Sequence, residues 1–337
     1  MESPLVSVCI PAYNNADTIL ETIQSVLTQT YQNLELIVVD DRSTDDTYQV
    51  VKTFAKQAGD DRLHLYQNEK NLGMAGNWNH CMELCKGDFI KLLCADDLIH
   101  ETLLAREVEI MERYPEANLV QTDTRFVDMH GKTTGYYKRY HASGLVEGRK
   151  ACRFSAFTRD YLGAPLANLI RRSAYEAWGG FDPSFVYIID YDFFMRICCK
   201  GKIYILHEPL NSFRIRNDSN TSQVMNGDKK DVYLEEHKRL VERYAKELHL
   251  SRWQVNPADE FSRRHLSKDF CEVTMKKRLV IIPAFNEVGS IERTVEDIKK
   301  NAPSFDYVII NDHSMDGTKE LCDRLGYNMV TLSINSG

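Results

Sequence analysis

The sequence has 337 residues, and 43% of them are hydrophobic, which is enough to form a substantial core in more than one domain. Acidic residues outnumber basic residues by 49 to 42, and the formal net charge is −7. This balance argues against a surface that grips a long polyanion, so nucleic acid is not an expected partner.

The nine cysteines are scattered along the chain, without a C-x-x-C pair or the spacing of a zinc site. This distribution favours a reducing compartment. The first ten residues carry no basic leader, and no stretch reaches the roughly 18 apolar residues of a membrane-spanning helix. We therefore expect a cytoplasmic protein that is neither exported nor integral to a membrane.

Short apolar runs alternate with amphipathic segments in the first hundred residues. The runs predict buried strands at 5–10, 34–39, 63–67 and 89–94. Between the first two, Ile19, Ile23 and Val26 recur at helical spacing behind Asp17, which can cap the helix. Similar helices are predicted after 43–46 and at 75–86. The alternation predicts an α/β fold with a mostly parallel central sheet and helices on both faces.

Polar segments follow each predicted strand. These segments are 11–14, 40–41, 68–73 and 96–97. Because ligands of parallel sheets bind beyond the carboxyl ends of the strands, we expect the four segments to meet at one edge.

The two acidic pairs at this edge have simpler interpretations. Asp40 and Asp41 alone could cap the following helix, and Asp96 and Asp97 could cap a helix that begins near Thr102. Adjacent carboxylates directly after a buried strand repel each other unless a cation is near, however. Together the pairs favour a site for a metal ion or a ribose.

The pattern between residues 119 and 216 is less regular. A helix is predicted at 192–200, ended by Gly201, and a longer helix at 228–249. Residues 251–277 are polar and charged and are the predicted linker.

The opening of the sequence recurs after this linker. The second copy aligns 280–291 with 8–19, 309–318 with 38–47, and 335–337 with 71–73. In this copy Asp312 corresponds to Asp41. We therefore divide the chain into a first domain at 1–225, a helical extension and linker at 226–277, and an incomplete second domain at 278–337.

Half of a doubly wound sheet cannot bury both of its faces alone. We therefore expect the second copy to dock on the first domain or on a second chain, as in a homo-oligomer, or to remain mobile. Our hypothesis is that the coding sequence is truncated, which a longer natural open reading frame would support.

Five segments in order carry a resemblance to a known family. They are 6–14 (VSVCIPAYN), 38–47 (VVDDRSTDDT), 87–97 (GDFIKLLCADD), 178–182 (WGGFD) and 189–196 (IDYDFFMR). Together they resemble the inverting glycosyltransferases of family two, which have the A-type glycosyltransferase fold. The second copy resembles the start of a polyprenyl-phosphate glycosyltransferase domain.

The resemblance implies a role for each matching residue. A nucleotide-sugar site would comprise Pro11, Ala12, Tyr13, Asn14, Asp41, Asn71, Asp96, Arg214 and Arg216. Within it, Asp41 would accept a hydrogen bond from the base, and Asp96 would face the ribose. The two arginines, followed by 217–222, match a loop that closes over the diphosphate in relatives, although a solvated strand surface explains them nearly as well.

The resemblance further implies a divalent cation, Mn²⁺ or Mg²⁺, held by Asp97 with Asp96, and Asp190 as the catalytic base. Asp182 and Asp192 lie nearby, and only the family position favours Asp190. A hard cation needs only one or two protein carboxylates when phosphates supply its other ligands. It would stabilise the diphosphate leaving group while an ionised aspartate takes the proton of the acceptor hydroxyl.

This chain departs from the family pattern at two positions. Cys94 stands where the acidic motif usually has another Asp, and Ile189 stands where an acid often precedes the base.

The expected reaction moves a sugar from a nucleotide-diphosphate donor, with a UDP-hexose or UDP-N-acetylhexosamine favoured, to a hydroxyl of a glycan or lipid-linked glycan. Peripheral association with the inner face of the cell membrane fits such an acceptor, although no basic amphipathic helix indicates it. The alternative is a non-catalytic module with a nucleotide-sugar-binding or regulatory role. A dinucleotide-binding dehydrogenase is disfavoured, because the first strand is followed by PAYNN and not by G-x-G-x-x-G.

Overall fold

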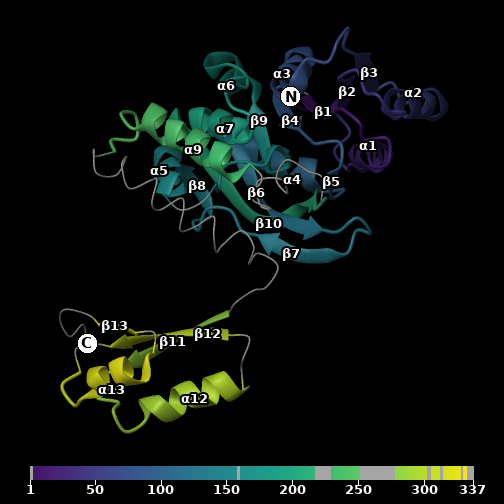
Figure 1. Cartoon of the computed structure of the whole chain (residues 1–337). Helices are drawn as coiled ribbons and strands as arrows, with labels where there is room; N and C mark the ends of the chain where they lie inside the picture. Colours follow the sequence, from purple (N-terminus) through teal and green to yellow (C-terminus); the bar gives the residue numbers. More distant parts are fainter. Residues whose placement is uncertain are drawn as a thin grey trace. The chain divides into compact units, whose positions relative to one another are not determined.

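The computed structural model describes residues 3–157, 160–216, 229–250, 278–301, 305–311, 314–327 and 329–331. The chain divides into two compact units, Met1–Cys271 and Glu272–Gly337 (Figure 1). Three predicted features lie outside the described residues: the linker at 251–277, the loop at 217–222, and the repeat positions Asp312 and 335–337.

In the described part of the first unit, ten strands form one mixed sheet. The strand order is β3 (Leu63–Gln67), β2 (Leu34–Asp40), β1 (Val6–Ala12), β4 (Phe89–Leu92), β9 (Asn168–Arg171), β6 (Ala117–Val127), β10 (Lys202–Arg214) and β5 (Leu98–Ile99). Two further strands pair off this path, β7 (Thr133–Tyr137) with β6 and β8 (Gly144–Glu147) with β10.

The first four strands in this order are parallel, as the sequence predicts. Beyond β4 the direction changes, because β9 runs antiparallel to both β4 and β6. The long strands β6 and β10 are then parallel to each other and lie side by side in Figure 1. The fold is therefore an α/β arrangement with a mixed sheet that is parallel around the predicted edge.

Helices cover both faces of this sheet. They are α1 (Ile19–Leu27), α2 (Thr47–Ala58), α3 (Gly73–Leu84), α4 (Leu103–Arg113), α5 (Gly148–Phe157), α6 (Arg172–Trp178), α7 (Ile189–Cys199) and α9 (Lys230–Tyr244), with a 3₁₀ turn at Pro165–Ala167. Most bounds differ by one to three residues from the predicted ones, as is usual at frayed helix ends.

The two faces are visible in the alternation along β1. Val8 and Ile10 contribute to the hydrophobic cluster that contains residues of α1 and α4, whereas Cys9 between them contributes to the cluster on the opposite face. Successive side chains of a strand point to opposite faces, so all seven residues of β1 are buried. This burial explains why the strand is an unbroken apolar run in the sequence.

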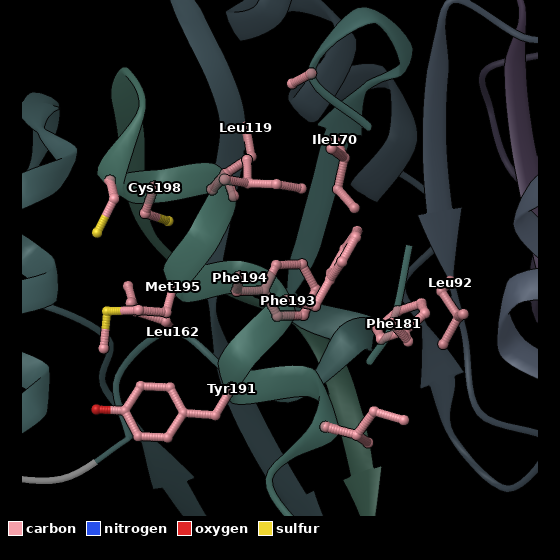
Figure 2. Close-up of a cluster of buried hydrophobic side chains, with 14 of the residues drawn as sticks. Leu92, Leu119, Leu162, Ile170, Phe181, Tyr191, Phe193, Phe194, Met195 and Cys198 are labelled. Atoms are coloured by element: carbon pink, nitrogen blue, oxygen red, sulfur yellow. The ribbon is translucent and has the colours of Figure 1, made fainter. Parts of the chain in front are cut away.

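Helix α7 lies at the centre of the second cluster. Figure 2 shows its residues Tyr191, Phe193, Phe194 and Met195 among side chains from the sheet and the loops around it. The helix predicted at 192–200 begins earlier, at Ile189, so Asp190 lies in its first turn. The rigid packing of α7 therefore fixes the backbone of the predicted base.

Helix α9 packs on the same cluster. Its residues Leu240, Val241 and Tyr244 are buried in the cluster that contains most of α7. It therefore belongs to the compact unit that carries the site, although the sequence places it in an extension.

The second unit repeats the opening of the first. Strands β11 (Arg278–Ala284), β12 (Phe305–Asn311) and β13 (Met329–Thr331) are parallel in that order, with helices α12 (Ile291–Asn301) and α13 (Thr318–Leu325). Ala284 pairs with Asn311 as Ala12 pairs with Asp40, so the register is also repeated.

Among the described residues, no helix is both long and apolar enough to cross a membrane.

Candidate active site

Asp41 follows β2 and connects three of the predicted polar segments. Its backbone N–H donates to the carbonyl of Ala12 at 2.8 Å, and its carboxylate accepts from the side chain of Asn68 at 2.7 Å. The carboxylate also accepts the backbone N–H groups of Leu72 at 2.8 Å and Gly73 at 3.0 Å. Asp41 is buried and still has a lone pair on Oδ2, which a nucleotide base could use.

Asn71 lies on the outer side of this loop. Its side-chain amide donates to the Asp41 carbonyl at 3.0 Å, and its Oδ1 accepts the N–H of Gly73 at the same distance. Its side chain therefore shapes the loop around Asp41, while the residue as a whole is exposed.

The loop after β1 is held by Asn14, which has a positive φ of 55°. Its N–H donates to Ser43 Oγ at 3.0 Å, and its Oδ1 accepts the N–H of Thr44 at 2.9 Å. Asparagine tolerates this left-handed conformation better than most residues. Pro11 and Ala12 are buried at the end of the strand, and Tyr13 is 46% exposed beside this interlocked pair of loops.

Asp97 follows β4 and is 1% exposed. Its Oδ1 accepts the backbone N–H of Arg214 at 3.0 Å, but its Oδ2 is buried with no hydrogen-bond partner among the described residues. Burial raises the pKa of Asp97 well above its ordinary value, and the charge of half-buried Asp96 raises it further. A buried carboxylate oxygen without a partner is costly unless a ligand completes the site.

A cation fits this turn on the donor chemistry, since carboxylate oxygens are preferred ligands of Mg²⁺ and Mn²⁺. In the described ranges, no group of three or more His, Cys, Asp or Glu side chains could hold a metal ion by itself. Asp97 and Asp96 could thus supply only part of a coordination sphere.

Arg214 braces the acidic turn from inside. Its side chain is 3% exposed, and its guanidinium donates to the carbonyl of Asp96 at 2.9 Å and to the carboxylate of Glu21. A solvated surface position, one of the two interpretations from sequence, is therefore wrong for Arg214, because strand β10 enters the sheet next to the turn. Its role at a phosphate stays a prediction.

Arg216 lies nearer the surface and forms an ion pair with Asp17 at 3.4 Å. The predicted helix cap at Asp17 is wrong. The N-cap of α1 is Thr18, which makes no side-chain cap bond and instead donates its hydroxyl to the carbonyl of Ala95 at 3.0 Å.

Asp190 occupies the first turn of α7. Its Oδ2 accepts the N–H of Ala164 at 3.0 Å, and its Oδ1 accepts the N–H of Tyr191 at 2.9 Å. Burial raises the pKa of Asp190 above its ordinary value, an effect that these two hydrogen bonds partly offset. The neighbouring Asp192 is fully buried and forms ion pairs with Arg196 at 2.9 Å and Arg243 at 2.9 Å, so it has a structural role.

Cys94 lies among the predicted carboxylates. Burial raises the pKa of the Cys94 thiol well above its ordinary value, and the charges of Asp97, Asp96 and Asp190 raise it further, in that order. The turn that donates to Asp190 leads into the 3₁₀ turn Pro165–Ala167, which packs against β4, the strand that precedes the acidic turn.

Two carboxylates that no motif predicts accept backbone N–H groups in the segments next to Asp190. Asp160 lies on the turn that donates to Asp190, and Glu236 of α9 accepts the N–H groups of Val186, Tyr187 and Ile188 directly before α7. Neither carboxylate can be recognised from the sequence. Glu236 bonds backbone groups that are distant in the chain, and Asp160 bonds backbone groups in an irregular loop.

The second unit repeats the two backbone hydrogen bonds that hold the loop of Asn14. Asn286 has φ of 57°, its N–H donates to Ser314 Oγ at 2.9 Å, and its Oδ1 accepts the N–H of Met315 at 3.0 Å. The repeat in the sequence therefore corresponds to a repeat of structure.

The model of one family, described as glycosyl transferase family 2, matches residues 7–179 and 279–337. The chain belongs to glycosyl transferase family 2. It is a glycosyltransferase, and the match covers both the acidic turn and the repeated opening.

Individual proteins agree with this family 2 assignment. The uncharacterized protein MT1568 of Mycobacterium tuberculosis (strain CDC 1551 / Oshkosh) is 30% identical over 237 residues, which cover 66% of this chain and 70% of that protein. TarS of S. aureus in complex with UDP-GlcNAc has a similar fold, with a TM-score of 0.59, 20% identity, and coverage of 78% of this chain and 73% of TarS.

The mannosyltransferase PcManGT of Pyrobaculum calidifontis, in complex with GDP-Man and Mn²⁺, also has a similar fold. The TM-score is 0.56 at 18% identity, with coverage of 90% of this chain and 83% of that one. At these identities the two structures establish the fold of this glycosyltransferase and not its substrates.

Proposed function

We propose that the chain is an inverting glycosyltransferase that moves a sugar from a nucleotide-diphosphate donor to an acceptor hydroxyl, with Asp190 as the base. The observation that carries this proposal is the carboxylate of Asp97, whose Oδ2 is buried without a hydrogen-bond partner among the described residues. The second carboxylate, Asp190, accepts the N–H of Ala164 directly before the 3₁₀ turn Pro165–Ala167, which packs against β4.

The donor site in this proposal is the edge formed by the loops after β1, β2 and β4. Asp41 would accept a hydrogen bond from the base through its remaining lone pair. Exposed Tyr13 would lie against the nucleoside, with Pro11, Ala12 and Asn14 setting the shape of the loop. Asn71 would keep the Asp41 loop in place, and Asp96 would reach the ribose.

A divalent cation, Mn²⁺ or Mg²⁺, would be held by Asp97 with help from Asp96. When bound, such a cation neutralises the charge that develops on a diphosphate leaving group. Arg214 keeps the turn in position, since it bonds both the carboxylate of Asp97 and the carbonyl of Asp96. Arg216 would lie near the diphosphate.

Asp190 would take the proton from the acceptor hydroxyl as its oxygen attacks the sugar. Burial raises the pKa of this carboxylate, so its ionised form is a stronger base than a solvated aspartate. Attack from the face opposite the leaving group, in one displacement, inverts the anomeric configuration, as in glycoside hydrolysis.

We propose a UDP-hexose or UDP-N-acetylhexosamine as the donor and a glycan or lipid-linked glycan as the acceptor. The complexes of TarS with UDP-GlcNAc and of PcManGT with GDP-Man and Mn²⁺ support a nucleotide sugar and a cation in this fold. Peripheral attachment to the inner membrane face, and assembly with a second chain, are part of the same proposal.

The Asp190→Asn variant tests the base assignment. We expect transfer to fall by about 10²–10⁴-fold, the usual contribution of a positioned base. The donor should still raise the thermal unfolding midpoint as in the wild type, because the donor loops are unchanged. Transfer at the wild-type rate would disprove the base assignment.

A matched control is Asp128→Asn in the turn between β6 and β7. This change removes the same charge from a residue that also accepts two backbone N–H groups, from His130 and Lys132 at 2.9 Å each. It should leave transfer unchanged. A wild-type protein that binds donor but transfers no sugar would instead favour the non-catalytic alternative.

A further inference from the structure

The turn between residues 160 and 164 holds two carboxylates with consecutive backbone N–H groups. Asp160 Oδ1 accepts the N–H of Leu162 at 2.9 Å and of Gly163 at 2.7 Å. The next N–H, that of Ala164, donates to Asp190 Oδ2 at 3.0 Å. The position of Asp190 is therefore tied to Asp160 through three adjacent peptide groups.

Two features of this turn indicate that its geometry is closely constrained. A Cβ atom on Gly163 would lie 2.0 Å from Asp160 Oδ2, so the carboxylate can approach only because this residue is glycine. Ala164 has a φ of 59°, which is uncommon for a residue with a side chain. Such backbone strain persists only where the surroundings over-determine it, and it often occurs at functional sites.

Arg139 holds the turn from the other side. Its guanidinium is buried and donates to the carbonyl of Gly163 at 3.0 Å, to the carbonyl of Thr122 at 3.2 Å and to Thr124 Oγ1 at 2.8 Å. The hydroxyl of Tyr137 donates to the carbonyl of Asp160 at 2.6 Å. The turn is thus anchored to strands β6 and β7 as well as to α7.

The charged and titratable groups that face the two carboxylates come from several elements. They are Arg139, Tyr137 of β7, Tyr191 of α7, Tyr233 of α9 and Cys94. Burial raises the pKa of Tyr191, Tyr233 and Cys94, so these three stay neutral at neutral pH, and the guanidinium stays charged. Burial first, and the charge of Asp190 second, raise the pKa of Asp160 to about 7.

We propose that Asp160 is a positioning residue for the transfer reaction: it holds the Asp190 carboxylate in place through the turn at residues 162–164. The inference rests on the proposed function of Asp190. It also assigns a role to a carboxylate that lies outside every motif, in a chain with Ile189 where an acid often precedes the base.

The variants Asp160→Asn and Asp160→Ala test this role. Asparagine keeps an Oδ1 that can accept both N–H groups of the turn, but it has no charge. The charge of Asp190 helps to raise the pKa of Asp160 to about 7, so Asp160 is neutral while Asp190 titrates. We therefore expect Asp160→Asn to keep the acid limb of the pH profile of kcat/KM and most of the plateau rate, because the turn keeps its hydrogen bonds.

Alanine removes the hydrogen bonds as well. We expect kcat to fall by about 100-fold while donor affinity is kept, since small misplacements of a catalytic group have effects of this size. Gly163→Ala should resemble it, because the added methyl group displaces the Asp160 carboxylate. Asp128→Asn, which removes a charge from a comparable turn, should keep the wild-type profile.

A measurement of stability, which needs no enzyme activity, keeps the test independent of the proposed reaction. Because the pKa of folded Asp160 is raised to about 7, the contribution of this residue to stability should be complete below about pH 4 and lost as the pH rises through 7. Denaturant midpoints at pH 5 and pH 8 should therefore differ less for Asp160→Asn than for the wild type or Asp128→Asn.

The outcomes distinguish this inference from the proposed function. A wild-type kcat in Asp160→Ala, or a loss in Asp160→Asn as large as that in Asp160→Ala, would overturn the inference while transfer by the wild type stands. An unchanged difference between the two denaturant midpoints would also overturn it. A wild type without transfer, combined with the predicted difference in midpoints, would overturn the reaction and leave the coupling of the two carboxylates in place.

Discussion

At the scale of single residues, the carboxylate of Asp97 has an environment unlike that of an ordinary acidic turn, a feature that it shares with Asp40, whose Oδ1 is also buried without a partner among the described residues. Oδ1 of Asp97 has a partner, whereas its Oδ2 is buried without one among the described residues. A structural aspartate would be expected to satisfy both oxygens. The asymmetry therefore favours an oxygen that is reserved for a ligand.

The Asp97→Asn variant makes this testable. The amide oxygen can still accept the N–H of Arg214, so the unfolding midpoint without ligands should stay at or above that of the wild type. The additional stabilisation that Mn²⁺ gives to the donor complex should be lost. A variant that keeps this dependence on Mn²⁺ would remove Asp97 from the cation site. Asp128→Asn is again the control.

At the scale of elements, two helices are joined to the sheet and to the site by buried carboxylates. Lys91 of β4 and Glu107 of α4 form a fully buried ion pair at 2.8 Å. Glu236 of α9 accepts the three N–H groups before α7. The first contact joins elements that nearly follow each other in the sequence, and the second joins α9 to a loop about 50 residues earlier.

Replacing one partner of the buried pair should be more harmful than replacing both. Lys91→Met leaves the Glu107 charge unpaired in the core and should lower the free energy of unfolding by about 3–5 kcal/mol. The double variant with Glu107→Leu should recover most of this loss, because the Glu107 charge is also gone. Chemical denaturation of the two single variants and the double variant measures the coupling. Equal losses in the single and double variants would contradict the expectation.

Removing the Glu236 carboxylate should affect both stability and catalysis. Glu236→Ala leaves three N–H groups before α7 without their acceptor, with an expected loss of about 2–3 kcal/mol in unfolding free energy. It should also lower kcat, since Asp190 lies two residues after the last of these groups, at Ile188. Glu236→Gln keeps one oxygen acceptor and should lose less of both. A kcat that stays at the wild-type value in Glu236→Ala would show that this contact does not position α7.

The first half of the sheet was predictable because each strand can be recognised from its own residues. Strands β1 and β2 are buried on both faces, so each is an apolar run, and the acidic pairs directly follow such runs. The second half was not, because β9 inserts between β4 and β6 from a distant part of the chain and reverses direction. Arg214 could not be placed either, because its burial depends on how β10 enters this mixed sheet.

At the scale of the whole molecule, each unit contains a loop of the same structure, but only the first contains the candidate site. Asn14 and Asn286 accept corresponding backbone N–H groups, whereas the acidic turn and α7 have no counterparts among the described residues of the second unit. We therefore expect Asn14→Ala to weaken donor binding several-fold and Asn286→Ala to leave it unchanged. Titration of the donor against the intrinsic fluorescence of each variant measures this. An equal effect of the two changes would show that the second unit takes part in donor binding.

The two copies of the loop distinguish the side chains that maintain its shape from those that differ. In both units its cross-links join backbone N–H groups to the side chains of an asparagine, a serine, an aspartate and a threonine. Tyr13 of the first unit is Phe285 in the second, and Thr44 is Met315, with these backbone cross-links kept although Met315 cannot form the bond that the Thr44 hydroxyl makes to Asn14. These two positions are therefore natural places to engineer a changed preference for the nucleoside, because new side chains there should leave the scaffold of the loop intact.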